Sequence, residues 1–199
     1  MAIRIGIWGD SITYGVGDSE KGGWVERLKV FLWKKREIDV YNRGVGADRT
    51  DDVIKRFEVE CKAILPEIVI FSIGINDSVY ICERNNPKVS IRKFRKNIKK
   101  LIGLAKKYAG RIIFIGLTSV DDKKTMPVPW NRNKSYENAI IAKYDNLIKE
   151  VCKENKLLFI PMFELLNKKE LFDGLHPTPK GYEKMFNRIK KFLIKNKII

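Results

Sequence analysis

The chain has 199 residues, of which 44% are hydrophobic and 32% are charged, a composition typical of one globular domain that buries its own core. No apolar run approaches the ~20 residues of a membrane-spanning helix, so we expect no transmembrane segment. The formal net charge of +16 is compatible with an anionic partner such as nucleic acid or a membrane surface.

Much of the positive charge falls in stretches with helical periodicity. Between residues 90 and 108, lysines lie opposite an apolar stripe formed by Phe94, Ile98, Leu101 and Leu104. This arrangement is typical of a helix whose lysines face solvent. Since no nucleic-acid-binding motif accompanies the charge, we expect no nucleic-acid partner. A basic nucleic-acid-binding protein is kept as a non-enzymatic alternative.

The first residues and the cysteines indicate the cellular compartment of the protein. Residues 3–8 form a short apolar run followed at once by turn residues, which predicts a strand rather than a signal peptide. The three cysteines, Cys61, Cys82 and Cys152, are far apart and odd in number, which predicts reduced thiols and no metal site. We therefore expect a cytoplasmic protein.

Short apolar runs alternate with longer amphipathic stretches along the whole chain, a pattern that predicts an α/β fold with a parallel sheet between helices. We expect five strands, at residues 3–8, 38–41, 67–73, 111–117 and 157–160. We expect five long helices, at residues 24–35, 50–64, 90–108, 135–154 and 178–195. Since no repeat or linker interrupts the pattern, we expect residues 1–199 to form a single domain.

Two connections between the predicted elements are candidates for functional segments. Thr178 is suited to cap the last helix and Pro179 to occupy its first position, so His176 lies just before a helix. The segment 118–134 is the least regular, and it follows the fourth strand at its carboxyl end, where open α/β sheets bind ligands. It is either a wall of a substrate pocket or an ordinary surface loop.

A serine and a histidine lie where this sheet type places its ligands. Gly9-Asp10-Ser11 follows the first strand, although a serine in such a turn can also be a simple cap. Asp173-Gly174-Leu175-His176-Pro177 precedes the last helix. An aspartate three residues before a histidine can orient the ring and leave Nε2 free to take a proton from a serine. His176 is the only histidine of the chain.

Two further turns follow the second and third predicted strands. Asn42-Arg43-Gly44-Val45-Gly46-Ala47-Asp48 is rich in small residues that allow close backbone approach, and it can present a backbone N–H or simply connect a strand to a helix. Gly74-Ile75-Asn76-Asp77-Ser78 contains an amide that can donate to a developing oxyanion, or it is an ordinary turn.

In chain order, these four segments resemble the sequence blocks of the GDSL-type, or SGNH, hydrolase superfamily. The resemblance runs from about residue 5 to residue 186 and includes Gly22-Gly23-Trp24 and Gly181-Tyr182. It implies a flavodoxin-like three-layer α/β/α sandwich with strand order 2-1-3-4-5, and ester hydrolysis through an acyl-serine intermediate without a cofactor or metal.

The resemblance also implies a role for each site residue. Ser11 is the nucleophile, His176 the base and Asp173 its orienting acid. The oxyanion donors are the backbone N–H of Ser11, a backbone N–H of the second segment and the side chain of Asn76. Asp10 and Asp77 are expected to orient and support their neighbours.

The second segment departs from the family pattern. Ala47 stands where the family usually has a glycine, with Gly46 one place earlier. An alanine keeps its N–H, so we expect the donor to be retained provided that φ at Ala47 is below zero. Either Ala47 or Gly46 then supplies the second backbone donor.

The substrate is less well determined by the sequence. We expect a small-molecule ester: a short-chain acyl ester, an acetylated sugar or a lysophospholipid-like molecule, with thioesters as an alternative. Tyr80, Trp130 and Arg132 are candidate pocket residues. A flavodoxin-like nucleotide-binding protein is a further alternative of the same fold, although the first turn lacks a phosphate-binding glycine motif. The sequence makes no prediction of oligomeric state.

Overall fold

The computed structural model describes residues 2–33, 37–81 and 86–199. Its centre is a five-stranded parallel sheet in the order β2-β1-β3-β5-β7. The strands are β1 (Ile3–Gly9), β2 (Ile38–Gly44), β3 (Ile68–Ser72), β5 (Arg111–Ile115) and β7 (Leu158–Ile160). Counted along the predicted strands this order is 2-1-3-4-5, so the predicted topology is confirmed.

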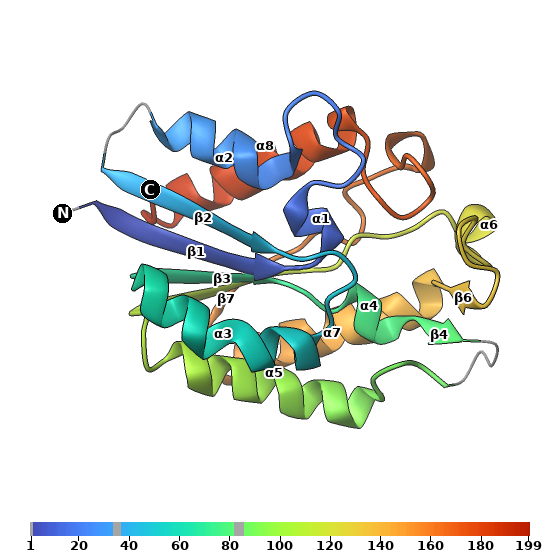
Figure 1. Cartoon of the computed structure of the whole chain (residues 1–199), viewed down its shortest axis with the longest axis horizontal. Helices are drawn as coiled ribbons and strands as arrows, with labels where there is room; N and C mark the ends of the chain where they lie inside the picture. The colour runs from blue at the N-terminus through green and yellow to red at the C-terminus, as the bar shows by residue number, and fades with distance from the viewer. Residues whose placement is uncertain (1, 34–36, 82–85) are drawn as a thin grey trace.

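Five long helices cover the sheet in two layers (Figure 1). One face carries α2 (Gly23–Trp33) and α8 (Pro179–Lys195), and the other carries α3 (Thr50–Ile64), α5 (Ile91–Ala105) and α7 (Asn138–Glu154). The predicted α/β/α sandwich is therefore confirmed. Both chain ends lie at the edge of the sheet opposite to the carboxyl ends of the strands.

The core follows from strands that are buried on both faces. All five residues of β3 are buried, as expected for a central parallel strand with a continuous apolar sequence. Aromatic rings fill the layer between the sheet and α3: Trp8 lies 4.6 Å from Phe57, and Phe71 lies 5.0 Å from Phe114, between ring centroids. Large rings packed in this way supply much of the buried apolar area.

The amphipathic helix predicted at residues 90–108 is confirmed. Its apolar stripe is buried and its lysines are exposed, so these charges belong to a solvated face. The helix begins one residue later than predicted, because Ser90 caps it by accepting a hydrogen bond from the backbone N–H of Lys93. It ends three residues earlier than predicted.

The other predicted boundaries differ from the structure by a few residues. Thr178 caps α8 through the N–H of Gly181 and Pro179 is its first residue, as predicted. The helix expected from residue 135 begins instead at Asn138, because Ser135 is paired in a strand. The predicted end of the helix at residue 35 and Cys82 lie outside the described residues.

Short elements gather at the carboxyl edge of the sheet (Figure 1). They are α1 (Ser11–Tyr14), α4 (Ile75–Ser78), α6 (Asp122–Thr125), a 3-10 turn at Lys168–Glu170, and the antiparallel pair β4 (Tyr80–Ile81) and β6 (Lys134–Ser135). The segment 118–134 therefore contains a helical turn and joins a small second sheet. Among the described residues, no helix is long and apolar enough to cross a membrane.

Candidate active site

Ser11 is held at the end of β1 by the two residues before it. Gly9 packs so tightly that a Cβ there would lie 2.0 Å from the hydroxyl oxygen of Thr13, so only glycine fits. Asp10 caps α1 by accepting the backbone N–H of Ile12 at 2.9 Å. Burial raises the pKa of the Asp10 carboxyl to about 7. This geometry leaves Ser11 as the first residue of α1, just after the carboxyl end of β1.

His176 is placed by a narrow turn before α8. The N–H of Phe172 donates to the carbonyl of His176 at 2.7 Å, and Gly174 takes the left-handed φ of 95° that the turn requires. Oδ1 of Asp173 accepts the backbone N–H groups of Leu175 and His176 at 2.9 and 2.8 Å. The aspartate therefore shapes the turn as well as facing the histidine ring.

The three predicted catalytic side chains form one hydrogen-bonded series. Ser11 Oγ lies 2.9 Å from Nε2 of His176, and Nδ1 of His176 lies 2.6 Å from Oδ2 of Asp173. Burial opposes ionisation of Asp173, but the hydrogen bonds from the ring and backbone of His176 outweigh it and lower the pKa of the carboxyl. An ionised Asp173 directs the Nδ1 proton toward itself, which leaves Nε2 as the acceptor for the serine proton.

The segment 42–48, which follows β2, ends in a β-turn. The N–H of Asp48 donates to the carbonyl of Val45 at 3.2 Å, and the N–H of Val45 donates to the carbonyl of Gly9 at 3.1 Å. Within the described part of the chain, the N–H groups of Gly46 and Ala47 have no hydrogen-bond acceptor. Both of the predicted alternatives for a backbone donor are therefore available.

The condition placed on Ala47, a φ below zero, is not met: φ is 64°. Ala47 is the third residue of the turn, the position at which a type II turn requires a positive φ and favours glycine. An L-residue in this region costs roughly 1–2 kcal/mol, which explains why a glycine suits this position. Here the alanine takes the glycine conformation rather than changing the turn.

Asn76 lies at the start of α4 with its amide fixed from both ends. Its Nδ2 donates to the carbonyl of Asp48 at 3.0 Å, and its Oδ1 accepts the hydroxyl of Tyr136 at 2.6 Å. The second Nδ2 hydrogen has no acceptor among the described residues. Because the Asp48 carbonyl can only accept a hydrogen bond, it fixes which end of the amide carries the nitrogen, so the free group is a donor.

Asp77 fastens α4 to the beginning of α3. Its buried carboxyl accepts the backbone N–H of Thr50 at 3.0 Å and also the Thr50 hydroxyl. Asn97 of α5 donates to the same hydroxyl at 2.8 Å. Burial raises the pKa of Asp77 to about 7, against the lowering effect of the Thr50 hydrogen bonds. The network fixes the neighbour of Asn76 from two helices.

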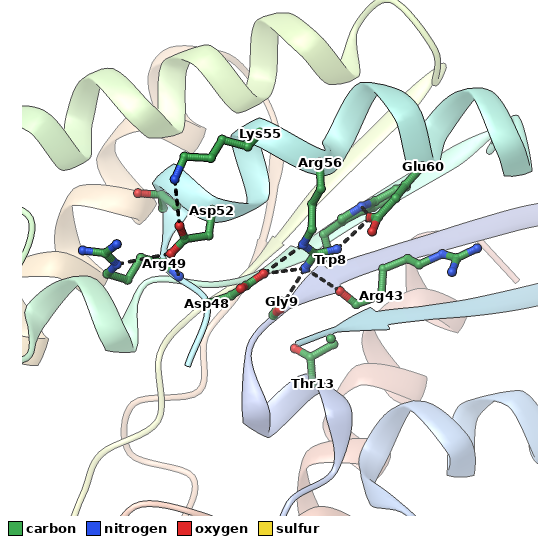
Figure 2. Close-up of polar contacts among 12 residues, drawn as sticks. Trp8, Gly9, Thr13, Arg43, Asp48, Arg49, Asp52, Lys55, Arg56 and Glu60 are labelled. Carbon is green, nitrogen blue, oxygen red and sulfur yellow. Dashed lines mark hydrogen bonds and ion pairs between the residues drawn. The ribbon is translucent and has the colours of Figure 1, made fainter. Parts of the chain in front are cut away.

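Arg56 of α3 ties the strand ends together (Figure 2). Its Nη2 donates to the carbonyls of Gly9 and Arg43 at 3.4 and 2.8 Å and lies 2.8 Å from Oδ2 of Asp48. Glu60 pairs with the same guanidinium at 2.6 Å. The Arg56 side chain therefore contacts the end of β1, the end of β2 and Asp48, whose carbonyl accepts the hydrogen bond from Asn76.

The three predicted pocket residues lie in different surroundings. The ring of Trp130 is half exposed and lies 5.8 Å from the ring of His176, between centroids. Tyr80 is buried, whereas its neighbours Val79 and Ile81 line a cavity, as strand alternation requires. Arg132 is exposed and is not among the described residues that line this cavity.

That cavity adjoins the site and has a volume of about 260 Å³. Its lining combines two candidate oxyanion residues, apolar side chains and three cations: Ala47, Arg49, Asn76, Val79, Ile81, Lys88, Lys134 and Tyr136.

Tyr136 and Arg56 contact the site, and neither was predicted from the sequence. Tyr136 reaches Asn76 across 60 positions and Arg56 reaches Gly9 across 47. Neither lies in a recognisable motif, and the only available signal was their position in segments that flank the sheet edge.

Comparison with known proteins identifies the family of the chain. The model of the GDSL-like lipase/acylhydrolase family matches residues 7–184. The human isoamyl acetate-hydrolyzing esterase 1 homolog is 24% identical over 205 residues, which cover 94% of this chain and 79% of that protein.

Solved structures share the fold. A lipase/acylhydrolase from Enterococcus faecalis has a TM-score of 0.77 at 23% identity, covering 98% of this chain and 96% of that one. An acetylxylan esterase from Geobacillus stearothermophilus has a TM-score of 0.73 at 20% identity, covering 95% and 93%. The family match spans nearly all of the sheet and every predicted site residue, and the chain therefore belongs to the GDSL-like lipase/acylhydrolase family of carboxylic ester hydrolases.

Proposed function

We propose that this protein hydrolyses small esters, acetyl esters foremost, through an acyl intermediate on Ser11. The observation that carries the proposal is the continuous series from Ser11 Oγ to His176 Nε2 at 2.9 Å and from His176 Nδ1 to Asp173 at 2.6 Å. Both distances are within the reach of proton transfer by general base catalysis.

In the first half of the reaction, Ser11 Oγ attacks the ester carbonyl while His176 takes its proton at Nε2. The carbonyl oxygen becomes an oxyanion, which accepts hydrogen bonds from the N–H of Ser11, the N–H of Ala47 and the free Nδ2 hydrogen of Asn76. His176 then gives the proton to the leaving alcohol as the carbon–oxygen bond breaks, and the acyl group remains on Ser11.

In the second half, water replaces the alcohol. His176 takes a proton from the water, whose oxygen attacks the acyl carbon, and the same donors hold the second oxyanion. The bond to Ser11 Oγ breaks, the serine regains its proton from His176, and the carboxylic acid leaves. Asp173 stays ionised throughout and stabilises the imidazolium.

Two observations favour a small substrate. The cavity beside Asn76 measures about 260 Å³, below the roughly 300–1,000 Å³ typical of pockets for drug-sized ligands. The names of two similar proteins, an isoamyl acetate-hydrolyzing esterase homolog and an acetylxylan esterase, both refer to acetyl esters.

A panel of p-nitrophenyl esters from acetyl to dodecanoyl, with acetylated sugars and an acetyl thioester, tests the proposal. We expect the highest kcat/KM for acetyl and butyryl esters and none of this turnover in Ser11→Ala. A maximum at dodecanoyl, or a thioester preferred over its oxygen ester, would contradict the substrate class. Turnover retained in Ser11→Ala would contradict the mechanism.

A further inference from the structure

The cavity beside the oxyanion residues has an unbalanced charge. Arg49, Lys88 and Lys134 line it, and the described lining residues include no carboxylate. Arg49 is partly offset by Asp52, whose Oδ2 lies 3.2 Å from its Nε, but that carboxylate does not line the cavity. Lys88 and Lys134 have no ion pair with a described carboxylate. Three cations with no carboxylate among the described lining residues produce a local positive potential.

The backbones that carry these cations are fixed. Lys134 belongs to β6 and pairs with Ile81 of β4, and the side chains of both residues line the cavity. On the other side of β4, the N–H of Lys88 donates to the carbonyl of Val79 at 2.8 Å. Arg49 directly precedes α3. The charges are therefore carried by paired strands and a helix start, which limits the entropy lost when a ligand binds.

The position of the cavity relates it to the reaction. Asn76, proposed above as an oxyanion donor, and Ala47, proposed as another, both line it. A substrate whose carbonyl oxygen reaches these donors therefore extends a neighbouring group toward the cations. The apolar side chains of Val79 and Ile81 complete the lining, so the cavity suits a short apolar spacer that ends in an anion.

Resting on the proposed ester hydrolysis, we infer that the substrate carries an anionic group a few atoms from its scissile ester, held by Arg49, Lys88 and Lys134. A carboxylate is the simplest group of this class, and a phosphate or sulfate shares its chemistry. The anion can belong to the acyl part or to the alcohol part of the ester.

Matched esters distinguish these two placements. Mono-p-nitrophenyl glutarate carries the charge on the acyl part and is compared with p-nitrophenyl valerate. 3-Acetoxybenzoate carries the charge on the alcohol part and is compared with phenyl acetate. We expect one anionic ester to exceed its neutral counterpart about 10-fold in kcat/KM, with a preference that falls as salt is raised.

The variant Lys88→Gln/Lys134→Gln tests the residues, with Lys106→Gln/Lys107→Gln in the exposed turn directly after α5 as the control of equal charge change. We expect the first variant to lose about 10-fold on the preferred anionic ester and to keep its rate on the neutral one. The control should keep both rates. Equal loss on both esters, or equal loss in both variants, would overturn the inference.

A binding measurement separates this inference from the proposed function. Ser11→Ala is titrated with monomethyl glutarate against methyl valerate and with 3-acetoxybenzoate against phenyl acetate, and binding is followed by ligand-observed NMR. Preferential binding of the anionic ester supports the inference if the preference is lost when Lys88→Gln/Lys134→Gln is added. This holds even where no ester is turned over. Equal binding of the anionic and the neutral ester in both pairs overturns it, whatever the activity of the wild type.

Discussion

The hydroxyl of Tyr136 donates a 2.6 Å hydrogen bond to Oδ1 of Asn76, and this bond holds the amide in place while its nitrogen donates to the carbonyl of Asp48. Tyr136→Phe removes it without changing the shape of the ring. We expect kcat to fall about 10-fold with little change in KM, because the amide loses its fixed orientation while its donor remains. Asn76→Ala removes the donor itself and should lower kcat about 10²- to 10³-fold.

Steady-state kinetics on p-nitrophenyl acetate, with the active sites counted by phosphonate titration, measures both variants. Should Tyr136→Phe keep the wild-type kcat, the hydroxyl has no role in orienting Asn76. Should Asn76→Ala keep it, Asn76 is not an oxyanion donor.

Replacing Gly46 by proline decides which backbone N–H serves the oxyanion. Proline removes the N–H of residue 46 and suits the second position of a turn whose third residue has a positive φ. An added Cβ at Gly46 meets no atom within 4 Å. With Ala47 as the donor, we expect Gly46→Pro to keep kcat within about threefold, whereas loss of a donor costs about 10²-fold or more. Gly46→Ala is the control, and a collapse of kcat in Gly46→Pro alone assigns the donor to Gly46.

We expect Arg56 to support turnover because it joins the ends of β1 and β2 to the turn that contains Asp48. Arg56→Met removes its bonds to the carbonyls of Gly9 and Arg43 and to Asp48. Because small displacements of catalytic groups are costly, we expect kcat to fall about 10- to 100-fold with KM nearly unchanged. Arg56→Lys should recover little, since an ammonium cannot make the same fork of contacts.

The matched control is Arg95→Met, which breaks surface ion pairs to Glu150 and Glu154. It should leave kcat unchanged. The two variants are compared per titrated active site and well below their unfolding temperatures, so that lost stability is not counted as lost catalysis. Equal kcat for wild type and Arg56→Met would show that the contacts of Arg56 serve stability alone.

The buried carboxyl of Asp77 makes stability depend on pH. Burial raises its pKa to about 7 from an ordinary value of 3.8, so the folded protein favours the neutral acid. This contribution to stability is fully present below the unfolded pKa and is lost as the pH rises through about 7. We expect the free energy of unfolding of the wild type to fall between about pH 4 and about pH 7, and to fall less in Asp77→Asn.

Urea unfolding at several pH values measures this dependence. Asp39→Asn is the control, because it removes one negative charge at an exposed position of β2. Asp10, whose pKa is raised to about 7 by burial as well, contributes the fall that remains in Asp77→Asn. The same fall in Asp77→Asn and in Asp39→Asn would contradict the role of the buried carboxyl.

The sequence was most informative where many residues share one pattern. The strands and long helices each carry enough apolar positions for their period to be recognised, and the order of the sheet followed from the resemblance. The β4 and β6 pair was missed because two residues per strand show no alternation. The positive φ of Ala47 was not predicted, because it depends on the turn type and an alanine does not indicate the turn position that favours glycine.

The same distinction applies to the site. Ser11, Asp173 and His176 lie in short local segments that resemble a family, and the structure brings them into contact. Tyr136 and Arg56 act over long sequence separations, and a single tyrosine or arginine has no pattern that marks it. Their roles follow only once the sheet places distant segments side by side.

Covalent labelling by a serine-reactive phosphonate tests the central claim most directly. We expect intact-mass spectrometry to show one adduct on the wild type, located at Ser11, and none on Ser11→Ala. His176→Ala should label far more slowly, because the base that activates the hydroxyl is gone. An adduct on another residue, or equal labelling of wild type and Ser11→Ala, would contradict the assignment of Ser11 as the nucleophile.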